Sequence, residues 1–234
     1  MTEKTLLVVG ADKISLNAIT SFRQSDALSI YVDRSTNIHR ISRLLLRRRL
    51  ALTLLLKMLY CEARRRGGAR SGMYSSIRSN VQLVRIIEEE VPMRIVLFRA
   101  GLIINKAVLS LGVPVMNIHC ARLPEYGGLG SINSALRAGS YQQNATLHRV
   151  TESIDAGAIL ETEPYLLDPA SSYCENEARA YAAGARLLRR ILKESCFPKL
   201  KPDGNGRSRQ RSEVSVMAGR RPPSVCHASR ATKH

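Results

Sequence analysis

Short runs of apolar residues alternate, along the first two thirds of the chain, with segments of helical spacing. The apolar runs lie at residues 5–10, 28–32, 94–98 and 114–119. Helical spacing is found at residues 12–24, 37–65, 80–91 and 105–112. Runs this short and this rich in Val, Ile and Leu are typical of strands buried on both faces. Strands that alternate with helices predict an α/β fold, with a mostly parallel sheet and helices on both faces.

The last third of the chain has a different pattern. Residues 144–150 alternate between apolar and polar positions like a strand, and a turn at Asp155-Ala156-Gly157 precedes another strand. Residues 174–194 form an amphipathic pattern with acidic residues in the first turns and basic residues in the last, as the helix dipole favours. The chain is therefore expected to end its folded part with two strands and a long helix.

The length fits one domain, because 234 residues are enough to bury a substantial core. Beyond residue 200 the chain is poor in large apolar residues and rich in Gly, Ser, Pro and Arg, which predicts disorder. We therefore expect a single Rossmann-like domain at residues 1–200 and a basic, disordered tail at residues 201–234.

Membrane insertion and secretion are not indicated. The apolar stretch at residues 51–60 contains a charge and is far shorter than the roughly 20 residues that span a bilayer. The N-terminus lacks the apolar region and cleavage site of a secretory signal, which predicts a cytoplasmic protein.

The cysteines are odd in number and scattered without zinc-like spacing, so free thiols and no metal site are expected. They are Cys61, Cys120, Cys174, Cys196 and Cys226.

The formal net charge of +17 comes mainly from two segments. Residues 34–70 carry eleven Arg and Lys against one Glu, and residues 201–234 carry eight against two acidic residues. The Arg-rich helix expected at residues 37–66 has two interpretations: a solvated face, or a surface that docks a phosphorylated or nucleotide-linked substrate. Both segments would attract anionic partners without reading sequence. Aromatic residues make up only 5% of the chain, with no Trp, so stacking platforms for nucleic acid are few.

Candidate chemistry lies where the apolar run at residues 114–119 ends. Asn117 and His119 are two residues apart, so their side chains leave a strand on the same face, at the edge where α/β sheets bind ligands. An imidazole moves a proton near neutral pH, and a carboxamide N–H can donate to a developing oxyanion. Asp155 is the natural carboxylate to hold the His119 tautomer and raise its pKa.

Five linked motifs resemble the folate-dependent formyltransferase family. They are NIH at 117–119, LPEYGG at 123–128, ALRAG at 135–139, ATLH at 145–148 and DAGAI at 155–159. Their order and separations match this family, which includes glycinamide ribonucleotide formyltransferase, the catalytic domain of methionyl-tRNA formyltransferase and the sugar N-formyltransferases. The resemblance is dense over residues 94–165.

The resemblance implies transfer of a formyl group from 10-formyltetrahydrofolate, a co-substrate, to a primary amine. It makes Asn117, His119 and Asp155 the catalytic residues. It also implies a folate pocket lined by the loop at residues 99–104, with Leu102 and Ile103 as wall residues, and by Asn117 and Asp155. His148 is expected to pack beneath the site, and the Cys120 side chain to point away from His119.

The acceptor amine is approached by exclusion. The segment after the first strand, GADKIS, has one glycine where the resemblance to glycinamide ribonucleotide formyltransferase implies a glycine-rich phosphate loop. The polar tail is too short to bury the core of a tRNA-binding domain. This favours a nucleotide-linked amino sugar, a phosphorylated small molecule, with no specific nucleic acid as partner. Glycinamide ribonucleotide and a non-catalytic relative that binds anionic surfaces remain alternatives, and a homodimer is one option for assembly.

Overall fold

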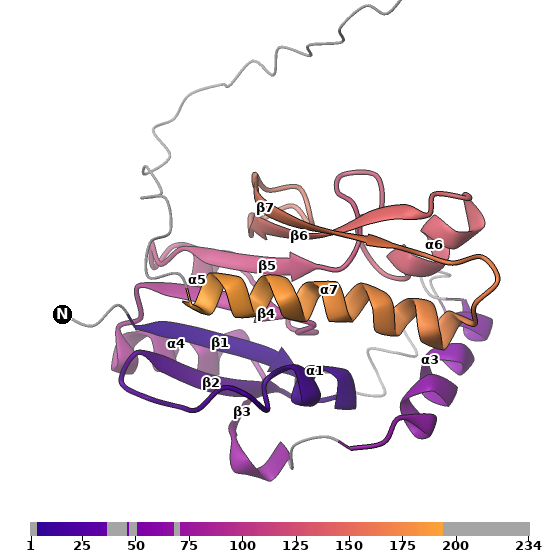
Figure 1. Ribbon diagram of the computed structural model, residues 1–234. Coiled ribbons are helices and arrows are strands. Elements are labelled where there is room, and N and C mark those ends of the chain that lie inside the picture. Colours follow the sequence, from indigo (N-terminus) through magenta and orange to yellow (C-terminus); the bar gives the residue numbers. More distant parts are fainter. Residues whose placement is uncertain (1–3, 37–45, 47–50, 68–70, 194–234) are drawn as a thin grey trace, which may run out of the picture. The chain divides into compact units, whose positions relative to one another are not determined.

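The structure is a computed structural model that describes residues 4–36, 46, 51–67 and 71–193. Its strands are β1 (Thr5–Gly10), β2 (Leu28–Asp33), β3 (Ser75–Ile77), β4 (Arg94–Phe98), β5 (Val115–His119), β6 (Gln142–Arg149) and β7 (Ile159–Leu166). Its α-helices are α1 (Lys13–Ala18), α3 (Leu52–Arg64), α4 (Asn80–Glu90), α5 (Lys106–Leu109), α6 (Ser131–Arg137) and α7 (Tyr173–Lys193), with a short 3₁₀ helix at Ser71–Met73. Figure 1 shows their arrangement.

All of these strands belong to one sheet, in the order β3-β2-β1-β4-β5-β6-β7. The strands from β3 to β5 are parallel, whereas β6 pairs antiparallel with β5 and β7 antiparallel with β6. This confirms the predicted α/β, mostly parallel, Rossmann-like sheet. It also places the end of β5 beside β6, so a residue on β6 can face Asn117 or His119.

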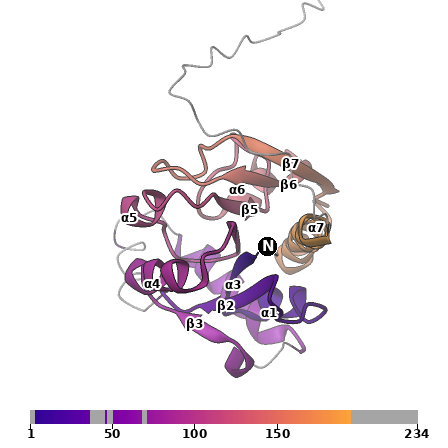
Figure 2. The same ribbon diagram turned by 90° about the vertical axis from the view of Figure 1, so that its left-hand side faces the viewer.

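Helices cover both faces of the sheet, as the apolar runs predict. Alternate residues of β1 belong to two separate cores, Leu7 and Val9 to one and Leu6 and Val8 to the other. The first core includes apolar residues of α1 and α7, and the second includes those of α4 and α5. Figure 2 shows α1 and α7 on one side of the strands and α4 and α5 on the other.

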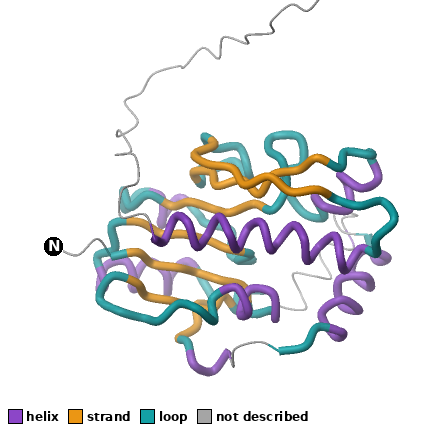
Figure 3. The backbone as a smooth tube through the Cα atoms, viewed as in Figure 1, coloured by secondary structure: helices purple, strands orange, loops and turns teal. Residues whose placement is uncertain are grey.

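Most predicted elements are present, with differences at short or glycine-rich segments (Figure 3). Helix α1 ends at Ala18 instead of extending to residue 24. Strand β3 was not predicted, because it has only three residues, all paired with β2, and so short a strand leaves no recognisable pattern in the sequence. Helix α6 was not predicted either, because it starts directly after Gly130, within a segment that reads as a glycine-rich loop.

Other predictions fall partly or wholly on residues outside the described ranges. Of the helix expected at residues 37–66, the structure describes α3 and residue 46, and Arg47, Arg48 and Arg49 lie outside the described part. The tail at residues 201–234 and the domain boundary at residue 200 also lie outside it and stay predictions. In the described part of the chain, no helix is both long enough and apolar enough to span a bilayer.

A disulfide joins Cys61 near the end of α3 to Cys174 at the start of α7. The prediction of free thiols is therefore wrong for this pair. The two residues are 113 apart in sequence, and their spacing gives no sign that α3 and α7 meet. Cys120 is free and buried, and Cys196 and Cys226 lie outside the described residues.

Replacing both Cys61 and Cys174 with Ser is expected to lower the free energy of unfolding by roughly 2–4 kcal/mol, because the cross-link closes a long loop and restricts the unfolded chain. Urea denaturation of the oxidised protein and of the double variant measures this difference. A reducing agent should lower the stability of the wild type and leave the variant unchanged. Equal unfolding midpoints for the oxidised wild type and the variant would contradict the prediction.

Candidate active site

Asn117 and His119 occupy the last residues of β5 and point to the same face of the sheet. That face is shared with Val115, which belongs to the core formed with α4 and α5. Met116 and Ile118, between them in sequence, belong to the opposite core with α7. An apolar strand fixed on both faces thus holds two polar side chains at its carboxyl end, with the His119 side chain 12% exposed.

Asp155 reaches these residues from the loop between β6 and β7. Its Oδ2 accepts a hydrogen bond from the Gly128 backbone N–H at 2.7 Å and lies 3.5 Å from His119 Nδ1. Its backbone has φ of 52°, which non-glycine residues adopt rarely and mostly as Asn or Asp. The structure therefore brings together the three residues selected from the sequence, Asn117, His119 and Asp155.

His148 on β6 is a fourth member of this group. It pairs directly opposite Asn117, and its Nε2 lies 3.1 Å from Asn117 Nδ2 and 3.4 Å from Asp155 Oδ1. Sequence reasoning placed His148 beneath the site but did not identify these contacts. The ATLH motif was the available signal, since a strand antiparallel to β5 can place its His beside Asn117.

The hydrogen-bond partners define the tautomer of both imidazoles. His119 Nε2 lies 2.7 Å from the Tyr126 carbonyl oxygen, and His148 Nδ1 lies 3.0 Å from the Arg149 carbonyl oxygen. A carbonyl only accepts, so each of these nitrogens carries the hydrogen. In a neutral ring His119 Nδ1 faces the Asp155 carboxylate without a hydrogen, so it donates to Asp155 only when the ring is charged. His148 Nε2 faces both the Asn117 carboxamide and Asp155 Oδ1.

The protonation of His119 and Asp155 follows from burial and from their partners. Burial lowers the pKa of His119, and this effect exceeds the opposite effects of the Asp155 carboxylate and the Tyr126 carbonyl. The expected upward effect of Asp155 on the His119 pKa is therefore present, but burial outweighs it. Burial raises the pKa of Asp155, but His148, His119 and the Gly128 N–H outweigh it and lower that pKa to about 2. At neutral pH the pair is an anionic carboxylate beside a neutral imidazole.

The glycine-rich loop after β5 positions the Asp155 carboxylate. Gly128 and Gly130 have φ of 80° and 74°, a region in which glycine is unstrained. A Cβ on Gly127 would lie 3.4 Å from the Asp155 Cβ, which indicates how closely the two loops approach. These glycines allow the Gly128 N–H to reach Asp155, and Gly130 starts α6.

Leu102 and Ile103, the predicted folate wall residues, lie in the loop after β4, the strand adjacent to β5. Leu102 is 9% exposed and packs in the core with α4, and its backbone N–H donates to Asp33 Oδ2 at 2.7 Å. Ile103 is 56% exposed, so its side chain is open to a ligand. Their role toward the folate stays a prediction, and the geometry favours Ile103 over Leu102.

Cys120 directly follows His119 but lies on the other face of the sheet. It is 5% exposed and belongs to the core formed with α7, where a Cβ on Gly184 would lie 2.6 Å from its sulfur. Burial raises the pKa of its thiol to about 12, so it is a thiol and not a thiolate at neutral pH. The buried position agrees with the expectation that Cys120 packs in the core and points away from His119.

Within the described residues, no group of three or more His, Cys, Asp or Glu is placed to hold a metal ion.

The lowered pKa of His119 predicts an acidic limb in the pH dependence of activity. If the neutral ring accepts a proton, kcat/KM falls as pH decreases through a pKa below the ordinary value of about 6.5. Because Asp155 raises the His119 pKa, Asp155→Asn should move this limb to lower pH as well as reduce the rate. A pH–rate profile of both proteins measures the shift. A loss of activity as pH rises through this pKa would mean that the protonated ring is required.

Comparison with known proteins places these residues in a family context. The model of the formyl transferase family matches residues 63–192. A methionyl-tRNA formyltransferase from Gluconobacter oxydans is 32% identical over 104 residues, which cover 44% of this chain and 34% of that protein. The chain thus matches about a third of the length of such curated relatives.

Two solved structures share the fold. Phosphoribosylglycinamide formyltransferase from Anaplasma phagocytophilum has a TM-score of 0.57 at 18% identity, covering 82% of this chain and 88% of that one. A Mycobacterium tuberculosis protein thought to be a sugar N-formyltransferase has a TM-score of 0.57 at 14% identity, covering 81% and 66% respectively. At these identities the likeness supports the Rossmann-like fold alone.

Proposed function

Because the chain belongs to the formyl transferase family, we propose that it transfers the formyl group of 10-formyltetrahydrofolate to a primary amine. The observation that carries this proposal is the meeting of Asn117, His119 and Asp155 at the carboxyl end of β5. These groups fit acyl transfer, which needs a donor for a developing oxyanion and a group that moves one proton.

The roles of the three residues follow from their hydrogen bonds. The acceptor nitrogen forms a bond to the formyl carbon, the bond from that carbon to the folate nitrogen breaks, and the proton lost by the amine ends on the folate nitrogen. One Asn117 N–H contacts His148, and the other is available for the formyl oxygen as its negative charge grows. His119 carries the proton between the two nitrogens, and Asp155 stabilises the ring while it is charged.

The contact between His119 and Tyr126 defines what must change when substrates bind. With Nε2 bonded to the Tyr126 carbonyl and Nδ1 facing Asp155, both ring nitrogens are engaged by the protein. For His119 to serve the reaction, we propose that the substrate replaces the Tyr126 carbonyl. The glycines at 127, 128 and 130 give this loop the backbone freedom to move.

For the acceptor we propose a nucleotide-linked amino sugar. The turn after β1 carries Asp12, whose side chain caps α1 through the Ser15 N–H at 3.1 Å and pairs with Arg99 at 2.8 Å. A carboxylate in this turn disfavours the phosphate of glycinamide ribonucleotide there, because two anions would share one site. That amine remains the alternative acceptor. A non-catalytic relative that binds anionic surfaces is the alternative outside enzymes, and the charge of residues 34–70 supports it.

The test is an incubation of the purified protein with 10-formyltetrahydrofolate and a panel of amines. The panel contains amino nucleotide-sugars, glycinamide ribonucleotide and methionyl-tRNA, and mass spectrometry detects the gain of one formyl group. Formylation of an amino nucleotide-sugar alone supports the full proposal, and formylation of another amine corrects the acceptor. Absence of formyl transfer to every amine, with the folate unconsumed, would contradict formyl transfer.

A cytoplasmic location is part of this proposal and can be tested through the disulfide. Cytoplasmic proteins mostly keep their thiols reduced, whereas the structure has Cys61 bonded to Cys174. Alkylation of protein extracted from cells under acid quench shows by mass whether these two thiols are free. If they are free, the location holds and the disulfide forms only on oxidation.

A further inference from the structure

A pocket outside the candidate active site lies between α3, α6 and the loop that precedes α7. It has a volume of about 290 Å³ and is lined by Lys57, Asn133, Leu136, Arg137, Pro169, Ser171 and Tyr173. None of the residues given a role in formyl transfer lines it. Two of its side chains, Lys57 and Arg137, are cationic, and no carboxylate lines it. The pocket therefore has the charge of an anion site.

The donors of this pocket are uncommitted among the described residues. The side chains of Lys57, Arg137 and Asn133 make no ion pair or hydrogen bond with another described residue. The Tyr173 phenol is different, because it packs against the core and interacts with the charges of Glu177 and Arg99. Ser171 Oγ donates to Asp168 Oδ2 at 2.6 Å. An ammonium, a guanidinium and a carboxamide thus border one cavity with their hydrogens available.

The local structure holds these side chains in place. Asn133, Leu136 and Arg137 have the i, i+3, i+4 spacing that puts residues on one face of a helix. Lys57 stands one turn before Cys61 on α3, and Tyr173 adjoins Cys174, so the disulfide fixes the wall that carries Lys57 beside the wall that carries Tyr173. The disulfide therefore holds the backbone of α3, which carries Lys57, beside the start of α7.

The nearest carboxylates are occupied by other partners. Asp168 accepts from Ser171 and from Arg179, and Glu175 accepts from the Ser172 backbone N–H and hydroxyl. Neither lines the cavity, so neither neutralises Lys57 or Arg137 directly. At the end of α6, the Ser134 and Leu136 carbonyl oxygens accept from the Ala138 and Gly139 N–H groups, which satisfies that end of the helix.

We infer that this pocket binds a phosphate group, through the Lys57 ammonium and the Arg137 guanidinium, with the Asn133 carboxamide as a further donor. An arginine fork and a lysine point charge are the side chains that phosphate oxygens select. The size of the cavity accommodates one phosphate or a diphosphate. This inference does not depend on formyl transfer, because the binding requires neither the folate nor the catalytic residues.

Isothermal titration of the oxidised full chain with inorganic phosphate and with pyrophosphate, at constant ionic strength, tests this site. Saturable binding is expected, and Lys57→Gln or Arg137→Gln should each weaken it by roughly 3- to 10-fold. The control is Arg85→Gln, which removes the same charge from an exposed residue of α4 and should leave the affinity unchanged. Both lining residues are exposed, so their variants are expected to fold normally.

Two results would overturn the inference. One is a failure of both anions to bind saturably to the folded wild type. The other is an equal loss of affinity in the Arg85 variant and in the two pocket variants, which would show attraction by the overall charge of the chain. A stronger response to pyrophosphate than to phosphate would identify a diphosphate as the preferred ligand, and the reverse would identify a single phosphate.

Discussion

Replacing His119 with Asn is expected to lower the rate of formyl transfer by roughly 100- to 10,000-fold, the usual contribution of a general acid–base group. An asparagine preserves polarity and a donor to the Tyr126 carbonyl, but it cannot carry a proton near neutral pH. His119 sits at the end of β5 with its ring facing Asp155, so its loss removes chemistry more than packing. Single-turnover kinetics with saturating folate and amine separates the chemical step from binding.

The matched control is Cys120→Ala, at the next residue of the chain. This thiol packs on the opposite face against α7, so its removal should cost some stability and leave turnover nearly unchanged. Circular dichroism and the melting temperature show that both variants fold. Near-normal turnover of the His119→Asn variant would contradict the proposed role of His119 in proton transfer. A large loss of turnover in the Cys120→Ala variant would mean that the site is sensitive to packing alone.

The strands and the meeting of the candidate site residues were predictable because their signals are local. The run at residues 94–98 is β4 without change, and the spacing of Asn117 and His119 places both on one face of β5. The linked motifs identified Asp155. The contacts of His148 depend on the antiparallel register of β6 against β5, which alternation alone does not determine. The net pKa shift of His119 depends on how deeply the ring is buried, a quantity that no sequence pattern contains.

The contacts between α3 and α7 could not be predicted from the sequence either, because they too depend on how distant elements pack. Glu62, Arg65 and Glu177 look like solvated charges on two amphipathic helices, and Cys61 and Cys174 look like isolated thiols. Only the packing of α3 onto the start of α7 makes them a disulfide and a set of ion pairs. Charged residues on helices are usually solvated, so the sequence gives no sign that these residues pair.

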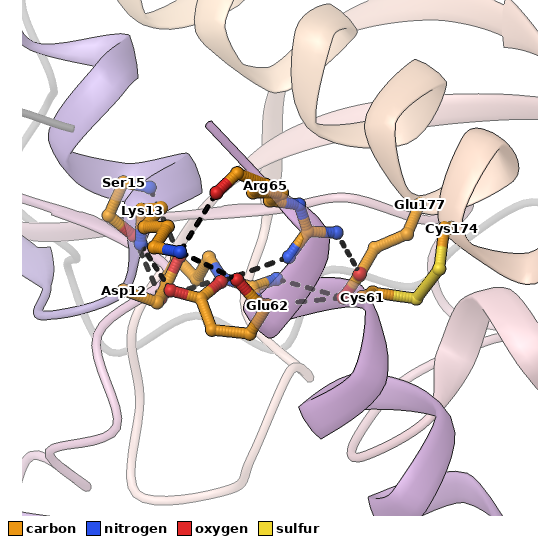
Figure 4. A network of polar contacts seen from close by, with 9 residues as sticks. Asp12, Lys13, Ser15, Cys61, Glu62, Arg65, Cys174 and Glu177 are labelled. Atoms are coloured by element: carbon orange, nitrogen blue, oxygen red, sulfur yellow. Dashed lines mark hydrogen bonds and ion pairs between the residues drawn. A yellow bond between two sulfur atoms is a disulfide. The ribbon is translucent and has the colours of Figure 1, made fainter. Parts of the chain in front are cut away.

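These ion pairs centre on Glu177 (Figure 4). Its side chain is 2% exposed, pairs with Arg65 directly after α3 and lies 3.4 Å from the Arg99 guanidinium, which also pairs with Asp12. Arg65 directly follows α3, with its N–H bonded to the Cys61 carbonyl, and Cys174 and Glu177 are three residues apart on α7, so the disulfide and the ion pair join the same two segments. Glu177 is therefore the anion that two buried or half-buried arginines share.

Replacing Glu177 with Gln is expected to lower the free energy of unfolding by about 1–3 kcal/mol, because it removes the buried carboxylate that both arginines share and leaves Arg65 with Glu62 and Arg99 with Asp12. The amide keeps the volume of the side chain, so the loss reports charge and not a cavity. Urea denaturation of the oxidised protein measures it. The control is Glu175→Gln on the same helix, an exposed carboxylate that should leave the unfolding midpoint nearly unchanged. Equal midpoints for all three proteins would show that Asp12 satisfies Arg99 and Glu62 satisfies Arg65, and that the pairing of α3 with α7 depends on the disulfide and not on Glu177.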